Sequence, residues 1–271
     1  MKNNITSLTP TNQELFMKRH RQHHRLVSLA RSVLLFGFLV LWEVSANLNW
    51  IDSFFFSSPG RVIVCFVSLW QEKALAMHIC ITLLETLISF LLVFLISLLL
   101  STALWYSVKL SEILEPYLVL LNSLPKSALA PLFIVWLGTG FTTIVIAGIS
   151  VALFGSIISF YSGFRQCNPD KITLIYTLGG NKKDAFCKVV LPNSIPNLIS
   201  TTKVNIGLAL VGVIIGEFLA ARRGLGYLII YGSQVFRLDM VITSILLLCV
   251  ISMGLYKLIQ TAEHYSQFYH K

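Results

Sequence analysis

The stretch that decides the fold is Ile79–Ser107, ICITLLETLISFLLVFLISLLLSTALWYS, in which Glu85 is the only charged residue. As a helix rising 1.5 Å per residue, this run would be about 43 Å long, whereas the hydrocarbon core of a bilayer is ~30 Å thick. It is typical of a membrane-spanning helix that tilts or projects beyond the bilayer, and we expect it to project into the cytosol.

Five more apolar windows, each near the ~20 residues that cross hydrocarbon as a helix, fall at 32–48, 115–137, 141–160, 198–220 and 241–259. Only 12% of the residues are charged and 55% are hydrophobic, whereas about a quarter of the residues in soluble domains are charged. The sequence therefore predicts an all-α membrane protein with six transmembrane helices.

The domain organisation follows from the same windows. We expect a basic cytosolic tail at 1–31, one transmembrane domain at 32–260 and a cytosolic tail at 261–271. The first 25 residues lack an apolar core followed by a small-residue cleavage site, so we expect no removable signal peptide.

Orientation follows from the 21 Lys and Arg residues. Fourteen flank the windows on the side of both termini, two lie within windows, and five lie opposite: Arg61, Lys73, Arg222, Arg223 and Arg237. Because basic residues collect on the cytosolic side, we expect both termini in the cytosol of a multi-pass protein of the bacterial cell membrane. The net charge of +9 then reflects topology and attraction to anionic lipid, and we expect no nucleic-acid partner.

The longest polar connection between the middle helices, at about 161–197, lies on the cytosolic side. Ile172–Leu178 can form a short helix that Gly179 and Gly180 break, and Asn181 can cap a second helix.

We expect Pro192 to stop that second helix. Its apolar positions recur at helical spacing, which predicts one face for docking: Ala185, Phe186, Val189 and Val190. An interfacial helix on lipid headgroups would have the same pattern, so amphipathicity alone leaves both interpretations open.

Three segments together resemble a known family. TLGGNKKDAFCKVVLPNSIPNLI, Thr177–Ile199, is similar to the EAA loop of binding-protein-dependent ABC importer permeases, in which a glycine, nine residues, an aliphatic residue, any residue and Leu-Pro follow one another. SLPKSALAPLFIVWLGTG, Ser123–Gly140, and GEFLAARRGLGYLI, Gly216–Ile229, resemble the nitrate, sulfonate and taurine branch of that family. The resemblance covers about residues 30 to 265.

The resemblance implies a permease subunit that works as a homodimer, docks a cytosolic ATPase dimer and receives solute from an external binding protein. It implies a coupling element that includes Thr173, Thr177, Gly179, Gly180, Phe186, Val189, Leu191 and Pro192. In the family's Glu-Ala-Ala position this chain has Thr173, Leu174 and Ile175, so an acidic contact to the ATPase is missing.

Charged residues inside the windows need a partner, an aqueous cavity or the interface. Lys126 lies among three prolines and is a candidate for lining the solute pathway, or a helix-end lysine that snorkels. Glu217 follows the GxxxG pair Gly212 and Gly216, so we expect it to face protein, in a structural contact or against solute. We expect Glu85 in the bundle interior or at a helix end.

The stretch Gly224–Ile229 is too short to span and is expected to form a re-entrant or surface turn, as a gate, a binding-protein contact or a plain connector. No GxxxxGK[ST] phosphate loop occurs in the sequence, so we expect this chain to bind no cofactor and ATP to be hydrolysed on a partner. The five cysteines and six histidines show no metal-ligand spacing.

Two other function classes are compatible with a polytopic membrane chain. An ion-coupled secondary transporter would need paired intramembrane carboxylates or broken helices in repeated halves, and neither is evident. A membrane-embedded enzyme would need a cluster of catalytic side chains at membrane depth. The solute itself is left open by the sequence, and the resemblance implies a small anion such as a sulfonate, taurine or nitrate, or a pyrimidine vitamin precursor.

Overall fold

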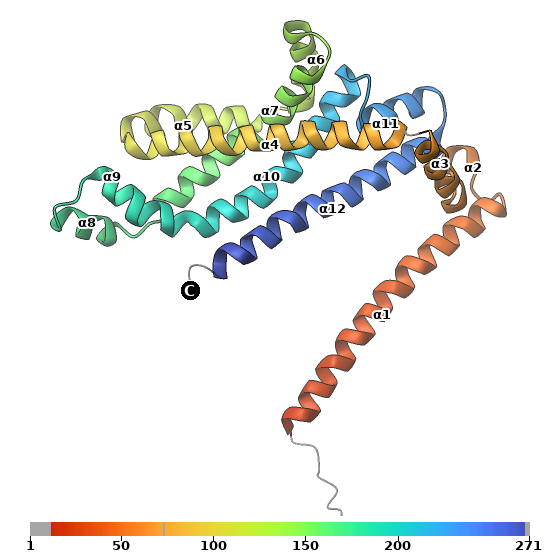
Figure 1. Cartoon of the computed structure of the whole chain (residues 1–271), viewed down its shortest axis with the longest axis horizontal. Coiled ribbons are helices and arrows are strands. Elements are labelled where there is room, and N and C mark those ends of the chain that lie inside the picture. The colour runs from red at the N-terminus through yellow and green to blue at the C-terminus, as the bar shows by residue number, and fades with distance from the viewer. Residues whose placement is uncertain (1–11, 73, 269–271) are drawn as a thin grey trace, which may run out of the picture. The chain divides into compact units, whose positions relative to one another are not determined.

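The computed structural model of the chain describes residues 12–72 and 74–268, and every regular element within them is helical. The elements are α1 Asn12–Asn47, α2 Ser53–Phe56, α3 Pro59–Gln71, α4 Ala74–Tyr106, α5 Val108–Ser123, α6 Lys126–Leu137, α7 Phe141–Arg165, α8 Pro169–Thr177, α9 Lys182–Ala185, the π-helical turn η1 Phe186–Val190, α10 Leu191–Ala220, α11 Leu225–Gln234 and α12 Leu238–Phe268 (Figure 1). The expected all-α class is confirmed.

The chain divides into two compact parts, Met1–Ile63 and Val64–Lys271. In the first part, the stretch Leu26–Asn47 of α1 is long and apolar enough to cross a membrane. The Gly60 N–H donates to the Glu43 carboxylate at 2.9 Å, which ties the start of α3 to the end of α1.

The second part is built around α4, α7 and α10, which pack on one another, while α11 and α12 pack together and against α10. One face of α4 carries its buried residues, which are mostly small and polar: Thr82, Glu85, Thr86, Ser89, Ser97 and Ser101. Exposed leucines such as Leu91 and Leu99 occupy other positions of the same helix. Small residues let helices approach closely inside the bundle, and lipid surrounds the exposed leucine side chains with hydrocarbon. The outer face of α4 is therefore apolar and its buried face is largely polar.

The GxxxG pair works as predicted for close helix approach. A Cβ added at Gly212 would lie 2.8 Å from the Ala147 carbonyl oxygen, and one at Gly216 would lie 2.9 Å from the Ile144 Cα. Glycine at both positions therefore lets α10 rest directly on the backbone of α7.

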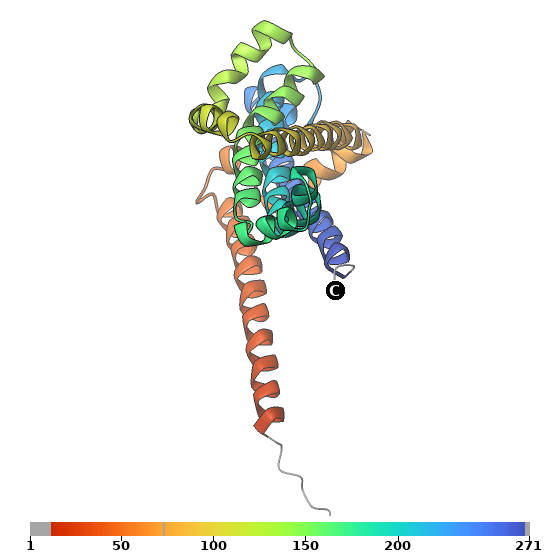
Figure 2. The same cartoon turned by 90° about the vertical axis from the view of Figure 1, so that its left-hand side faces the viewer.

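The window at 115–137 is not one straight span. It contains the end of α5 and all of α6, and these two helices meet at 95°; both views show α6 turning sharply away from α5 (Figure 1, Figure 2). Pro125 occupies the N-cap of α6 and the preceding Leu124 is extended, since a residue before proline is disfavoured in the helical conformation.

Within the residues that the structure describes, five helical segments are long and apolar enough to cross a membrane, and the bent α5–α6 pair would be a sixth. The longest, Lys182–Ala220, runs through α9, η1 and α10 over 39 residues. The chain is thus a multi-pass membrane protein.

Candidate functional site

The connection between α7 and α10 forms a compact helix-turn-helix. Asn168 caps α8 by accepting the Asp170 N–H at 2.8 Å, and Pro169 supplies the first turn. α8 ends where Gly179 adopts φ +82°, and the Gly180 N–H donates back to the Ile175 carbonyl at 2.9 Å. This is the break predicted at the glycine pair.

The two glycines serve different purposes. Gly179 has open space around its missing Cβ, so what it supplies is a left-handed backbone conformation that costs other residues about 1–2 kcal/mol. A Cβ at Gly180 would lie 2.9 Å from the Ile175 carbonyl oxygen, so Gly180 supplies room for the chain to fold back.

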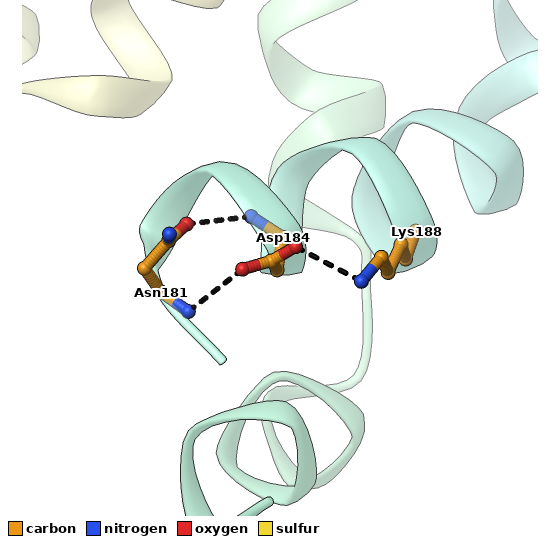
Figure 3. Close-up of polar contacts among 3 residues, drawn as sticks. All are labelled: Asn181, Asp184 and Lys188. Carbon is orange, nitrogen blue, oxygen red and sulfur yellow. Dashed lines mark hydrogen bonds and ion pairs between the residues drawn. The ribbon is translucent and has the colours of Figure 1, made fainter. Parts of the chain in front are cut away.

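The second helix begins with a reciprocal cap (Figure 3). Asn181 Oδ1 accepts the Asp184 N–H at 3.0 Å, and Asp184 Oδ2 accepts the Asn181 N–H at 3.1 Å. Lys188 Nζ lies 2.9 Å from the other carboxylate oxygen of Asp184, one helical turn further on. The predicted cap at Asn181 is therefore confirmed. Asp184 is fixed by Asn181 at the start of the helix and by Lys188 one turn later.

The expected stop at Pro192 is wrong. The second helix continues through Pro192 into α10, and the wide turn η1 directly precedes the proline, with the Leu191 N–H donating to the Phe186 carbonyl. A proline lacks the N–H for a normal helical bond and its ring crowds the preceding turn, and the wider π turn accommodates both effects.

The apolar face of the second helix lies within the chain's own bundle. Phe186 is buried, with its ring centroid 5.0 Å from Trp105, 5.5 Å from Tyr106 and 5.3 Å from Phe164. Val189 and Leu191 are partly buried against the same cluster. These residues anchor the element and do not present an exposed docking face.

The exposed apolar side chains of the element lie on the other helix and its turn. Leu178 is 75% exposed, and Leu174 and Tyr176 are also exposed. The hydroxyls of Thr173 and Thr177 donate to carbonyls of α8 itself, at 3.0 and 2.8 Å.

A buried carboxyl pair lies near the other end of α10. Glu217 is 1% exposed and accepts the Thr82 hydroxyl at 2.6 Å and the Gly226 N–H at 2.5 Å. The carboxyl group of Glu85, on the facing side of α4, lies close to that of Glu217.

The segment after α10 wraps around Glu217. α11 begins at Leu225, whose N–H donates to the Thr82 hydroxyl at 2.9 Å, and the Gly224 N–H donates to His78 Nδ1 at 2.8 Å. Gly224 has φ +118°, and a Cβ there or at Gly226 would collide with the Glu217 carboxylate. The GLGYLI stretch thus supplies the N-cap and the first residues of the ten-residue helix α11, whose N-terminus is capped by a buried acid.

The sequence predicted that Glu217 faces protein and left Glu85 between the bundle interior and a helix end, and it did not predict that the two lie close together. The usable signal was the spacing of Thr82, Glu85 and Ser89, which places three polar groups on one face of α4. That face had to meet a polar partner, and Glu217 on α10 is that partner.

Lys126 is the first residue of α6, directly after the bend. It is half-buried, and its ammonium group donates to the Asn122 carbonyl at the end of α5. No group of three or more His, Cys, Asp or Glu side chains able to hold a metal ion occurs within residues 12–72 and 74–268.

The family model for the binding-protein-dependent transport system inner membrane component matches residues 94–263. A probable ABC transporter permease of Haemophilus influenzae is 29% identical over 231 residues, covering 85% of this chain and 94% of that protein. A riboflavin transport system permease of Chloroflexus aurantiacus is 30% identical over 240 residues, covering 89% and 90%. The taurine transport system permease of Escherichia coli is 24% identical, covering 79% and 80%.

Among solved structures, an inward-facing conformation of the MetNI methionine ABC transporter aligns with a TM-score of 0.59 at 20% identity, over 70% of this chain and 93% of the other. At that identity the likeness concerns the fold.

Proposed function

Because the chain belongs to the family of binding-protein-dependent transport system inner membrane components, we propose that it receives its driving force from a separate cytosolic ATPase seated on α8 and the turn at Gly179. The chain is a membrane-spanning permease subunit of an ABC importer. The observation that carries the proposal is the exposed apolar surface of α8, held on a helix-turn-helix that is anchored in the bundle.

The anchoring explains how this element can transmit force. Phe186 packs against aromatic rings of α4 and α7. Lys182 Nζ donates to the Tyr106 carbonyl at the end of α4 at 2.8 Å. A push on α8 therefore reaches α4, α7 and α10 together, since packed interiors deform little and move as units.

The surface offered to the ATPase is apolar. Leu174 stands in the middle of the Thr-Leu-Ile sequence that replaces the family's Glu-Ala-Ala, and Leu178 lies one turn further on. Burying a leucine side chain contributes about 1.5–3 kcal/mol, so these two residues can supply a docking energy that does not depend on an acidic contact.

The remaining partners follow from the family and from symmetry. We infer a homodimer with one coupling element for each nucleotide site of an ATPase dimer, and an extracytoplasmic binding protein that delivers solute. ATP would bind the partner, because this sequence contains no phosphate-binding loop. We place both termini in the cytosol of a bacterial cell, from the distribution of basic residues.

The solute class is also a proposal. Relatives are named for taurine, aliphatic sulfonates, riboflavin and formylaminopyrimidine. These are small polar organic molecules, and we propose that this chain carries a small organic anion or a vitamin precursor.

The test is co-purification of the ATPase with a tagged Leu178→Asp variant. Since Leu178 is largely exposed, the substitution should leave the fold intact, and an aspartate in an apolar contact should weaken association about tenfold or more. Val108→Asp is the matched control, because Val108 is also an exposed apolar residue, at 65% exposure. It lies at the first turn of α5, close to Tyr106, whose carbonyl accepts the Lys182 ammonium group, but it is not part of α8.

ATP-dependent uptake by the complete assembly should fall with Leu178→Asp and persist with Val108→Asp. Equal ATPase recovery and equal uptake for both variants would remove α8 as the docking surface.

A further inference from the structure

A cavity of about 460 Å³ opens where α4, the start of α7 and the segment after α10 come together. This volume falls within the ~300–1,000 Å³ usual for small-molecule sites. Its wall includes Glu85, Thr139, Gly140, Arg222 and Arg223. The cavity is on the opposite end of α10 from the coupling element, because Pro192 and Ala220 lie at the two ends of that helix.

One part of the wall is suited to an anion. Arg222 and Arg223 are exposed, and among the described residues neither takes part in an ion pair within the chain. Gly140 is the N-cap of the 25-residue helix α7 and has no side chain to satisfy the first N–H groups. Unpaired helix N-terminal N–H groups attract negative charge, and guanidinium groups bind planar or tetrahedral oxyanions in pairs of hydrogen bonds.

A different part of the wall is suited to a hydrogen-bond donor. Glu85 is 2% exposed, and its Oε2 atom has no hydrogen-bond partner. The neighbouring Glu217 cannot turn to serve it, since its oxygens accept the Thr82 hydroxyl and the Gly226 N–H. A buried carboxyl oxygen left without a partner is rare in proteins, and Glu85 is one of the residues that line the cavity.

We propose that this cavity binds a small organic anion that also carries an N–H or O–H donor, with its anionic group at Arg222, Arg223 and the start of α7 and its donor at Glu85. The inference rests on the proposed function, in which this cavity is a binding site for solute on the external half of the translocation path. An inorganic anion would satisfy the arginines and leave the Glu85 oxygen unpartnered.

The experiment measures binding to the purified full chain in nanodiscs of neutral phosphatidylcholine by calorimetry. Three probes are compared. Taurine carries both the sulfonate and the amine, ethanesulfonate carries the sulfonate alone, and ethanolamine carries the amine without an anionic group. We expect saturable binding of taurine, binding of ethanesulfonate about 5- to 10-fold weaker because one hydrogen bond is lost, and no saturable binding of ethanolamine.

Variants separate the two parts of the site. Arg222→Gln combined with Arg223→Gln should weaken both sulfonates about tenfold or more. Glu85→Leu should remove the preference for taurine over ethanesulfonate. Glu85→Gln should keep that preference, because the amide keeps one acceptor oxygen for the donor of the ligand while its N–H can donate to Glu217.

Arg165→Gln is the control, since Arg165 lies at the last turn of α7, away from Gly140. The arginine pair is exposed, so its double variant keeps the proposal testable even if Glu85→Leu does not fold.

The absence of saturable taurine binding, or arginine and Glu85 variants with unchanged affinities, would overturn the site. Repeating the taurine titration in nanodiscs that contain phosphatidylglycerol tests whether the cavity binds a lipid headgroup instead of a solute. Competition between phosphatidylglycerol and taurine would also overturn the assignment to a solute. These outcomes are independent of the proposed function, which fails only if the complete assembly shows no ATP-dependent uptake or if Leu178→Asp retains it.

Discussion

Single residues shape both ends of this permease where the backbone must turn or approach a side chain. Gly179 reverses the chain after α8 with a positive φ, while Gly224 and Gly226 let the start of α11 close around Glu217. A side chain is excluded at Gly179 by the left-handed backbone conformation and at Gly226 by the neighbouring Glu217 side chain.

The conformational role of Gly179 predicts a specific loss. Gly179→Ala should strain the turn by about 1–2 kcal/mol and reduce ATPase recovery in co-purification, because α8 is no longer held in its docking orientation. Gly138→Ala is the matched control: Gly138 has φ +78° and open space, but lies in the turn between α6 and α7. If both variants recover equal amounts of ATPase, the turn does not position the docking surface.

The buried acid at α11 predicts a stability effect. Glu217→Leu removes the acceptor for the Thr82 hydroxyl and the Gly226 N–H, and each buried donor left unpaired costs about 1–3 kcal/mol. Thermal unfolding of the purified chain in detergent should show a clearly lower midpoint. Glu112→Leu, at an exposed position of α5, should leave the midpoint nearly unchanged, and a comparable midpoint for both would contradict the structural role of Glu217.

At the scale of elements, helix contacts in this protein depend on small residues, and helix breaks depend on how proline is accommodated. Pro192 is carried inside a continuous helix by the π turn before it, whereas Pro125 sits at the 95° bend between α5 and α6. The difference lies in the neighbouring backbone, because Leu124 is extended and the residues before Pro192 are helical.

The contact of α10 with α7 predicts a cost for enlarging its glycines. Gly212→Val would place a side chain against the Ala147 carbonyl and the Gly148 Cα, both 2.8 Å from the added Cβ, and overpacking of this kind costs about 1–3 kcal/mol. Thermal unfolding should show the loss. Gly254→Val in α12, where no atom lies within 4 Å of the added Cβ, should show little change; similar midpoints would mean that α10 and α7 separate more easily than their packing implies.

At the scale of the whole transmembrane domain, one helix joins the two candidate sites. The helical segment Lys182–Ala220 begins directly after the turn at Gly179 and Gly180 and its last turn carries Glu217, a length of about 58 Å at 1.5 Å per residue. Motion imposed at α8 can therefore reach the cavity near Glu85 through a single continuous element packed on α4 and α7.

The orientation of this helix is a testable prediction. In a cysteine-free background, an impermeant thiol reagent added to intact cells should label Gln234→Cys, at the last residue of α11, and should not label Lys183→Cys, in α9, because basic flanks place the latter in the cytosol. Both positions are exposed, so access depends on the side of the membrane. Labelling of Lys183→Cys alone would reverse the topology.

The energy source is also testable on the whole molecule. The pairing of Glu85 with Glu217 meets one requirement of an ion-coupled transporter, but Glu217 is engaged by Thr82 and by the start of α11. We therefore expect the lone chain in sealed vesicles to accumulate no taurine under a proton or sodium gradient, with ATP-driven uptake once the ATPase and binding protein are added. Accumulation driven by a gradient would contradict coupling through α8.

The sequence by itself determined the all-helical membrane class, the glycine turn after α8 and the cap at Asn181, because these depend on local composition and on backbone preferences within a few residues. The tertiary structure alone decided that the apolar face of Phe186 turns inward, that Pro192 is carried within a helix, and that Glu85 meets Glu217. Amphipathic spacing shows that a face is buried but not what covers it, and a charged residue in hydrocarbon needs a partner that spacing along one helix does not identify. Contacts between residues 132 positions apart, such as Glu85 and Glu217, exist only once α4 and α10 pack.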